Sequence, residues 1–224
     1  RLIIPAFSVG RTQHILYVLN KLVEQKRVPV TPVYVDSPLA SKATAIYARH
    51  QECYDEDAAA MVNRGDNPLK FPGLQFTQSV AESMALNEKP GPFIIISASG
   101  MCEGGRIVHH LRNGVANPRN IVLIVGFQAE HTLGRRIIER APVLNIFGDE
   151  VPLNARVHTI NALSAHADRR GLMAWFDAAN SKALRHTFAV HGDEAQVAAM
   201  KALLEERGAR GVMAPVQGQK VVLN

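Results

Sequence analysis

The feature that most constrains the fold is an alternation of short apolar runs with longer stretches of helical periodicity. Apolar runs at residues 2–4, 33–35, 93–97 and 121–125 predict buried strands. Helices are predicted at about residues 15–23, 36–49, 79–87, 107–113 and 133–138. Strands that alternate with helices in this way are typical of βα units around a largely parallel sheet. The sequence therefore predicts an α/β fold with a Rossmann-like parallel sheet.

The pattern changes after residue 140. Residues 143–147 and 156–160 have the character of two antiparallel strands that are joined through residues 148–152. Further elements are predicted as a helix at 169–178, a strand at 187–190, a helix at 194–207 and a last strand at 220–223. We therefore place a domain junction near residue 160, with a first domain of residues 1–160 and a second of residues 161–224.

Composition restricts the class of protein. Of the 224 residues, 47% are hydrophobic and 20% are charged, which is ordinary for a globular protein. The net charge of +5 is compatible with a polyanionic partner, but many other enzymes carry as much. Cys53 and Cys102 lie far apart, which argues against a disulfide framework and favours a reducing, cytoplasmic location. The longest apolar runs are too short to span a bilayer, so no membrane contact is expected.

The first residues of the sequence have the pattern of a buried strand rather than of an exposed terminus. Residues 1–5 contain no Met and enter an apolar run at once. Natural termini usually lie at surfaces. We interpret the chain as a fragment whose upstream part is missing, and a processed terminus is the alternative.

Two histidines near the end of the chain are candidates for chemistry. His166 and His191 each stand where an apolar run gives way to a polar stretch that starts a helix. A neutral imidazole can bind a metal ion, and a protonated one can donate to a leaving group. An open catalytic zinc site usually needs three protein ligands. The sequence therefore predicts only half of a metal centre.

Three loops that follow predicted strands are candidate anion sites, because free N–H groups at helix starts favour negative charge. They are residues 7–11, 36–38 and 99–106. In the third loop the glycines would let the backbone approach a phosphate, and Arg106 can pair with a phosphate through two N–H groups. The alternative is that these glycines only form a tight turn, and the loop alone favours that interpretation.

Other polar residues have structural interpretations by default. Asp36 either caps the helix that follows it or supplies a carboxylate to a cleft, and the local sequence favours the cap. His109 and His110 follow the glycine-rich loop, and we expect a packing or surface role for both. Cys102 has no fixed base near it in the sequence, so we expect it to be structural rather than nucleophilic.

Several motifs occur together in an order that resembles one known family. They are residues 4–13, 36–40, 99–101, 104–106, 126–130, 132–136, 164–168 and 190–194. On these motifs the chain resembles the β-CASP branch of the metallo-β-lactamase-fold nucleases. That branch includes RNase J and the cleavage endonuclease of the polyadenylation machinery. No single motif is specific, but the ordered set is.

The resemblance implies an architecture and an activity. Residues 1–160 would form a β-CASP domain, and residues 161–224 the C-terminal part of a metallo-β-lactamase domain whose N-terminal metal-binding part is absent. The implied activity is hydrolysis of RNA phosphodiester bonds by a ribonuclease that uses two zinc ions. The expected partners are single-stranded RNA, the missing N-terminal segment and a second copy of the chain in a homodimer.

The resemblance also implies roles for individual residues. His166 matches the catalytic histidine beside the scissile phosphate, which stabilises that phosphate or protonates the leaving oxygen. His191 matches a ligand of one of the two zinc ions. The residues expected to contact RNA phosphates are Ser8, Arg11, Ser37, Ser99, Gly100, Gly104, Gly105 and Arg106.

The sequence also departs from the family pattern. The family's His-x-His-x-Asp-His ligands are not found in these 224 residues. We therefore expect the chain alone to bind zinc poorly and not to cleave RNA. The alternative function is a non-catalytic α/β module that binds RNA or a nucleotide, or an inactive scaffold subunit. The retained His166 and His191, each followed by an acidic residue, argue against a decayed site.

Overall fold

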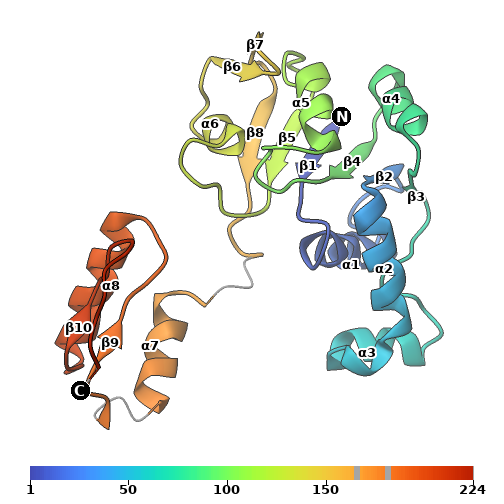
Figure 1. The fold of residues 1–224 in the computed structure, drawn as a ribbon. Coiled ribbons are helices and arrows are strands. Elements are labelled where there is room, and N and C mark those ends of the chain that lie inside the picture. Colours follow the sequence, from blue (N-terminus) through green and yellow to red (C-terminus); the bar gives the residue numbers. More distant parts are fainter. Residues whose placement is uncertain (164–166, 180–182, 224) are drawn as a thin grey trace. The chain divides into compact units, whose positions relative to one another are not determined.

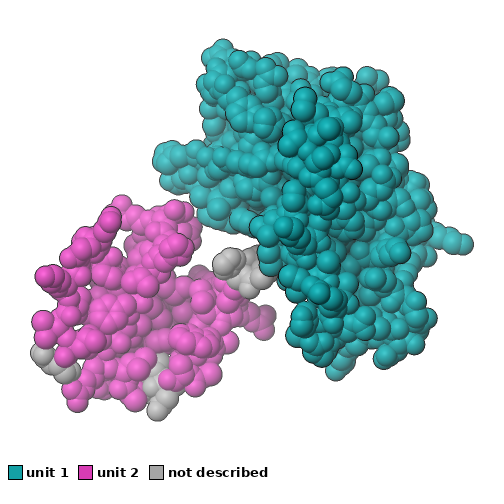
Figure 2. Space-filling view, turned by 45° about the vertical axis from the view of Figure 1, so that its right-hand side comes forward, with its two compact units in different colours: residues 1–164 teal, residues 165–224 magenta. Residues whose placement is uncertain are grey.

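The computed structural model describes residues 1–163, 167–179 and 183–223. The chain divides into two compact units, residues 1–164 and residues 165–224, which Figure 2 shows in teal and magenta. We describe each unit by itself. The predicted assignment of residues 1–160 and 161–224 to two kinds of domain stays a prediction.

The first unit is built on a six-stranded sheet in which every neighbouring pair of strands is parallel (Figure 1). In spatial order the strands are β3 (Leu74–Phe76), β2 (Val33–Asp36), β4 (Ile94–Ser97), β1 (Leu2–Pro5), β5 (Ile121–Ile124) and β8 (Arg156–Thr159). Parallel neighbours need crossover connections, and helices supply most of them. The predicted α/β class with a mainly parallel sheet is confirmed.

The helices of this unit follow the strands in the chain. They are α1 (Arg11–Glu24), α2 (Pro38–Arg49), the 3-10 turn η1 (Gln51–Cys53), α3 (Glu56–Asn63), α4 (Val80–Glu88), α5 (Arg106–Gly114) and α6 (Leu133–Ile138). Several begin at side chains that cap free N–H groups, such as Ser79, whose hydroxyl and Glu82 form a reciprocal capping box at α4. The sequence did not predict α3 or β3, which lie in a stretch of weak periodicity.

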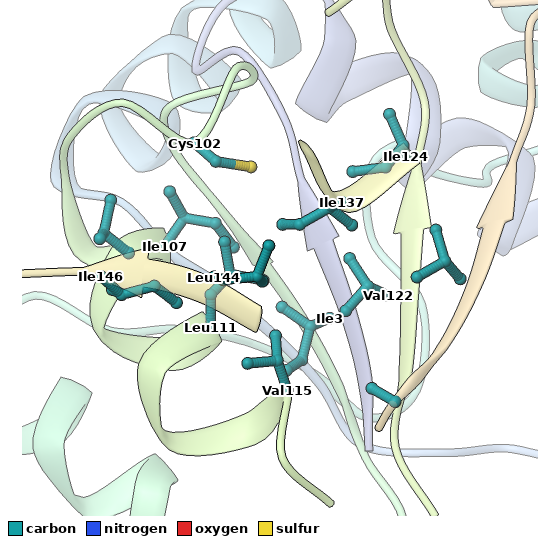
Figure 3. Packing of buried hydrophobic residues seen from close by; sticks show 13 residues of the cluster. Ile3, Cys102, Ile107, Leu111, Val115, Val122, Ile124, Ile137, Leu144 and Ile146 are labelled. Carbon is teal, nitrogen blue, oxygen red and sulfur yellow. The ribbon is translucent and has the colours of Figure 1, made fainter. Parts of the chain in front are cut away.

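Apolar side chains cover both faces of the sheet. Ile3 and Ile4 are neighbours in β1, and they belong to separate buried clusters because successive strand residues point to opposite faces. One cluster includes residues of α5, and Figure 3 shows Leu111 and Ile107 of this helix in the same cluster as Ile3. The other cluster includes Leu16 of α1. A parallel sheet that is covered on both faces explains why its strands read as continuous apolar runs.

The prediction that residues 143–147 pair with residues 156–160 is wrong. β6 (Val143–Ile146) pairs instead with β7 (Asp149–Pro152) in an antiparallel hairpin, and β8 joins the main sheet beside β5. Phe147 and Gly148 both have positive φ, at 56° and 86°, and two such residues form the tight turn that matches strand twist. The reversal therefore comes directly after β6, and β7 takes the place predicted for β8.

The second unit is a small α/β arrangement. Its elements are α7 (Arg169–Ala178), β9 (Thr187–Phe188), α8 (Glu194–Glu206) and β10 (Val212–Met213), and β9 and β10 are parallel. Its core is formed by Met173 and Phe176 of α7 with Leu203, Leu204 and Val212. The strand predicted at 220–223 is wrong, because Val222 is 77% exposed, whereas Val212 is buried and supplies the paired strand.

Within the described parts of both units, none of the helices has the length and apolar character that crossing a membrane requires.

Candidate functional site

The loops that directly follow β1, β2, β4 and β5 lie at one edge of the sheet, which we call the carboxyl edge. The register shows their proximity, because Pro5 of β1 and Asp36 of β2 both pair with Ser97 of β4. The carboxyl ends of parallel strands are a common position for ligand sites. The parallel sheet therefore brings together segments that are far apart in the sequence.

Two predicted contact residues, Ser8 and Ser37, meet at this edge. Their Oγ atoms are 3.0 Å apart and share a hydrogen bond. Ser37 is also the N-cap of α2, because its Oγ accepts a hydrogen bond from the N–H of Ala40. The prediction that Asp36 caps this helix is therefore wrong. Serine and aspartate are similarly good caps, and the chain uses the second of the two adjacent residues.

The segment of residues 99–105, which we call the glycine turn, connects β4 to α5. Gly105 has φ +77°, and a Cβ there would collide with the Ala98 carbonyl oxygen. A Cβ on Gly100 would lie 2.9 Å from the ring of Phe7, whereas a Cβ on Gly104 would meet nothing within 4 Å. Close packing therefore requires glycine at positions 100 and 105, whereas Gly104 faces open space.

A cavity of about 430 Å³ lies beside the glycine turn. Gly104, Gly105 and Arg106 line it together with His109 and Phe147, whose rings are in tilted contact with centroids 4.6 Å apart. A larger cavity of about 570 Å³ lies between α1, α2 and α3, and of the predicted loops it includes only Gly10. The smaller cavity is therefore the one that predicted contact residues line.

The most strongly bonded group of the carboxyl edge is the carboxylate of Asp36, which is fully buried. Its Oδ1 accepts hydrogen bonds from Thr77 Oγ1 at 2.5 Å and from Arg106 Nη1 at 2.7 Å. Its Oδ2 accepts from Ser83 Oγ at 2.5 Å and lies 2.6 Å from His110 Nε2. Four side chains from three segments thus surround one buried carboxylate.

The charge of Asp36 follows from these bonds. Burial by itself would raise the pKa of the Asp36 carboxyl, because it disfavours the charged form. Hydrogen bonds from His110, Ser83, Thr77 and Arg106 outweigh burial and hold this pKa well below its usual range. Asp36 is therefore an anion at neutral pH.

Sequence reasoning missed the role of His110. Its side chain is completely buried, and its Nδ1 lies 2.9 Å from Asn87 Oδ1 of α4. Both ring nitrogens thus face oxygen atoms of other elements, one on the strand end that carries Asp36 and one on α4. The available signal was spacing, because Arg106 and His110 are four residues apart and so share one face of α5.

Arg106, predicted as a phosphate contact, is already engaged within the chain. Besides its bond to Asp36, its Nη2 donates to the Gln78 carbonyl oxygen at 2.8 Å, and its side chain is 20% exposed. Arg11, at the start of α1, differs, because its Nε is buried and has no partner among the described residues. Ser99 Oγ accepts from the N–H of Glu103 inside the glycine turn.

The predicted metal residues belong to the end of the chain. His166 lies outside the described residues. His191 is exposed, with φ +67°, in the loop before α8. Among residues 1–163, 167–179 and 183–223 there is no group of three His, Cys, Asp or Glu side chains that could hold a metal ion. These residues alone do not fit a complete zinc centre, which needs at least three protein ligands.

Cys102, predicted to be structural, is buried among apolar side chains in the cluster of Figure 3. Burial and, less strongly, the neighbouring charge of Glu103 raise the pKa of its thiol to about 12. A thiol of this kind is rarely ionised and is a poor nucleophile.

Comparison with known proteins agrees with this architecture. The Beta-Casp domain family matches residues 12–137, and the Zn-dependent metallo-hydrolase RNA specificity domain matches residues 150–215. The chain is 40% identical over 208 residues to Ribonuclease TTHA0252 of Thermus thermophilus. The aligned region covers 93% of this chain and 47% of that protein.

Archaeal proteins are also similar. The transcription termination factor FttA of Methanosarcina mazei is 32% identical over 198 residues, 86% of this chain and 31% of the relative. An RNase J-like protein of Methanocaldococcus jannaschii is 32% identical over 175 residues, 78% of this chain and 39% of the relative. The chain thus spans less than half the length of each of these relatives.

The Beta-Casp match includes α5, the glycine turn and Asp36, and it extends over more than half of the chain. The resemblance that the ordered motifs indicated is therefore confirmed, and the chain belongs to the β-CASP family of metallo-β-lactamase-fold nucleases.

Proposed function

We propose that this chain is the RNA-binding part of a zinc-dependent ribonuclease that hydrolyses RNA phosphodiester bonds with two metal ions. Two similar proteins are named as a ribonuclease and as RNase J-like. The domain that matches residues 150–215 is described as the RNA specificity domain of Zn-dependent metallo-hydrolases. These similarities support the proposed substrate class and the proposed metal.

One observation carries the proposal, namely that three helices of at least nine residues, α1, α2 and α5, begin at the carboxyl edge. The positive end of the helix dipole favours a phosphate at such positions. The residues proposed to contact phosphates there are Ser8, Arg11, Ser37, Ser99, Gly100, Gly104 and Gly105. The net charge of +5 is compatible with a polyanion as the partner.

We propose that the bound RNA is single-stranded. Phe7 and Phe127, in loops that follow β1 and β5, are 46% and 71% exposed. Unpaired bases stack on exposed aromatic rings, whereas bases in a duplex are not available for such stacking. Phosphate contacts and stacking surfaces at the same edge suit a strand whose bases are free.

The two histidines keep the roles that the family resemblance implies. His166 would stabilise the scissile phosphate or protonate the leaving oxygen, and His191 would bind one zinc ion. The metal ions would supply charge stabilisation and an activated water. Because the described residues do not form a three-ligand set, we propose that the other ligands come from outside these 224 residues. The chain alone is then expected to bind zinc poorly and not to cleave RNA.

The alternative is an RNA-binding module without catalysis. It is favoured by the same missing ligand set in the described residues and by the similarity to proteins named as transcription termination factors. Stoichiometric zinc together with zinc-dependent RNA cleavage by the 224-residue chain would contradict our expectation for the chain alone.

Binding can be tested with a fluorescent single-stranded RNA of uniform sequence. We expect the chain to bind it, and Arg11→Ala to weaken binding and to lower the slope of log affinity against log salt by about 0.7, the value for one phosphate contact on a single strand. Arg27→Ala, beyond the far end of α1, is the matched control and should leave the slope unchanged. Absence of binding by the unaltered chain, or equal effects of the two variants, would exclude the proposed surface.

A further inference from the structure

The interactions of Arg106 suggest a role for it other than phosphate contact. Its guanidinium connects two acceptors on different segments, Asp36 at the end of β2 and the carbonyl of Gln78 before α4. A planar guanidinium can make both bonds at once, whereas an ammonium is a single compact charge. The side chain therefore ties the first turn of α5 to two other elements.

His110 makes a second connection one helical turn further along α5. Its Nε2 reaches the other oxygen of Asp36, and its Nδ1 faces Asn87 of α4. Together with Arg106 it fixes both the position and the rotation of the helix. The glycine turn enters this helix directly, because Gly105 is its N-cap residue.

Releasing Arg106 for an RNA phosphate would be costly. Asp36 is fully buried and bonded to Arg106 and His110, and removing one partner of a buried ion pair leaves an uncompensated charge. Binding of a phosphate to Arg106 would have to offset the loss of its ion pair with Asp36 before it increased the affinity for RNA. A guanidinium already bound in this way is better suited to holding the start of α5 in place than to contacting a ligand.

We propose that Asp36, Arg106 and His110 are positioning residues, which hold the glycine turn and the start of α5 in the shape that binds phosphate without themselves touching RNA. This inference rests on the proposed RNA-binding function. In this proposal the backbone of the glycine turn and Ser99, rather than the Arg106 guanidinium, contact the RNA phosphate.

Salt dependence separates positioning from direct contact, because only a residue that neutralises a phosphate changes the slope of log affinity against log salt. With the 224-residue chain and single-stranded RNA, we expect Arg106→Ala to weaken binding ~10-fold with an unchanged slope. Arg106→Lys should not restore affinity, because lysine cannot connect Asp36 and Gln78. A slope lowered by about 0.7, with affinity restored by lysine, would overturn the proposal.

The variant Asp36→Asn should change RNA affinity differently if Arg106 is a positioning residue than if it is a phosphate contact. Positioning predicts weaker RNA binding, and the double variant with Arg106→Ala should be no weaker than the weaker single one, because both changes break the same unit. If Arg106 were a phosphate contact, removing Asp36 would free it, and affinity would rise or stay the same. The matched control is Arg112→Ala, which lies on the same helix and pairs with Asp149 at the surface.

A measurement without RNA keeps the two proposals distinguishable. If the unaltered chain does not bind RNA, the proposed function fails, and amide hydrogen exchange of residues 99–105 still tests the positioning. Exchange should be faster in Arg106→Lys and in Ser83→Ala, a mild change that removes one donor to Asp36, and unchanged in Arg112→Ala. Equal exchange in all these variants would overturn the positioning role even if RNA binds.

Discussion

At the scale of single residues, charge compensation determines what Asp36 can be. A carboxylate that is fully buried is stable only when donors satisfy both oxygens, and here each oxygen has two. The donors come from the segment after β3, from α4 and from α5. One carboxylate thus stabilises the packing of several elements around the carboxyl edge.

This arrangement predicts a dependence of stability on pH. The pKa of Asp36 is lowered in the folded chain, so below about pH 4 the unfolded chain takes up a proton that the folded chain does not. The contribution of Asp36 is therefore complete above that pH and is lost progressively as the pH falls. Urea unfolding should show Asp36→Asn to be less stable by about 3–5 kcal/mol at pH 7, with a smaller difference below pH 4. A difference that does not change with pH would contradict this prediction.

The cysteines allow a second residue-scale prediction. Cys102 is buried and has a thiol pKa raised to about 12, whereas Cys53 is exposed. Iodoacetamide reacts with the thiolate, so we expect it to modify Cys53 in the native chain and Cys102 only after denaturation. Mass spectrometry of peptides from native and denatured samples measures both. Equal labelling in the native chain would mean that Cys102 is accessible.

At the scale of elements, the glycine turn shows how neighbouring residues of one type can differ. Gly105 has a positive φ and lies against the carbonyl of Ala98, whereas Gly104 has open space around it. A positive φ is costly for residues with a Cβ, and a backbone oxygen has little freedom to move away. The close approach, more than the number of glycines, defines the turn.

We therefore expect Gly105→Ala to lower the free energy of unfolding by at least about 1–3 kcal/mol. Gly104→Ala is the matched control, and its effect should stay within about 0.5 kcal/mol. Chemical denaturation of both variants gives the comparison. Similar losses for the two would mean that the turn does not have this backbone geometry.

The sequence predicted the central strands well because they are buried on both faces. β1, β4 and β5 read as apolar runs, and their parallel arrangement follows from the helices between them. β3 was missed because it is short and partly exposed. The hairpin of β6 and β7 was missed because Phe147 has a positive φ in its turn, and a phenylalanine in a sequence does not indicate that conformation.

The candidate site was predicted less completely. Ser8, Ser37 and the glycine turn stand out locally, because serines and glycines that follow a strand favour anion binding. The roles of Asp36 and His110 depend on contacts between residues 74 positions apart. Aspartate before a helix resembles a cap, and histidine on a helix resembles a packing residue, until the tertiary fold brings them together.

At the scale of the whole molecule, the two compact units have separate cores. The buried clusters of the sheet consist of residues from the first unit, and the cluster around Phe176 consists of residues from the second. A unit of about 60 residues buries little apolar surface and is marginally stable. A substitution in its small core should therefore have a large local effect.

Phe176→Ala is expected to destabilise the second unit by about 3–5 kcal/mol, because it removes a buried ring from that core. Amide hydrogen exchange should become faster in α7 and α8 and stay unchanged in β1, β4 and β5. Leu16→Ala, in the core of the first unit, is the reciprocal control. Faster exchange throughout the chain in both variants would show that the cores do not respond separately.

The position of β8 has a practical consequence for anyone who shortens this protein. This strand forms one end of the sheet and is paired with β5, yet it falls inside the matched range 150–215, apart from the rest of the sheet in 12–137. Cutting the chain between the two matched ranges would uncover the hydrogen-bonding groups of β5. Such an open strand can recruit strands from other molecules, so a shortened protein of this kind would tend to precipitate unless it kept the residues through 159.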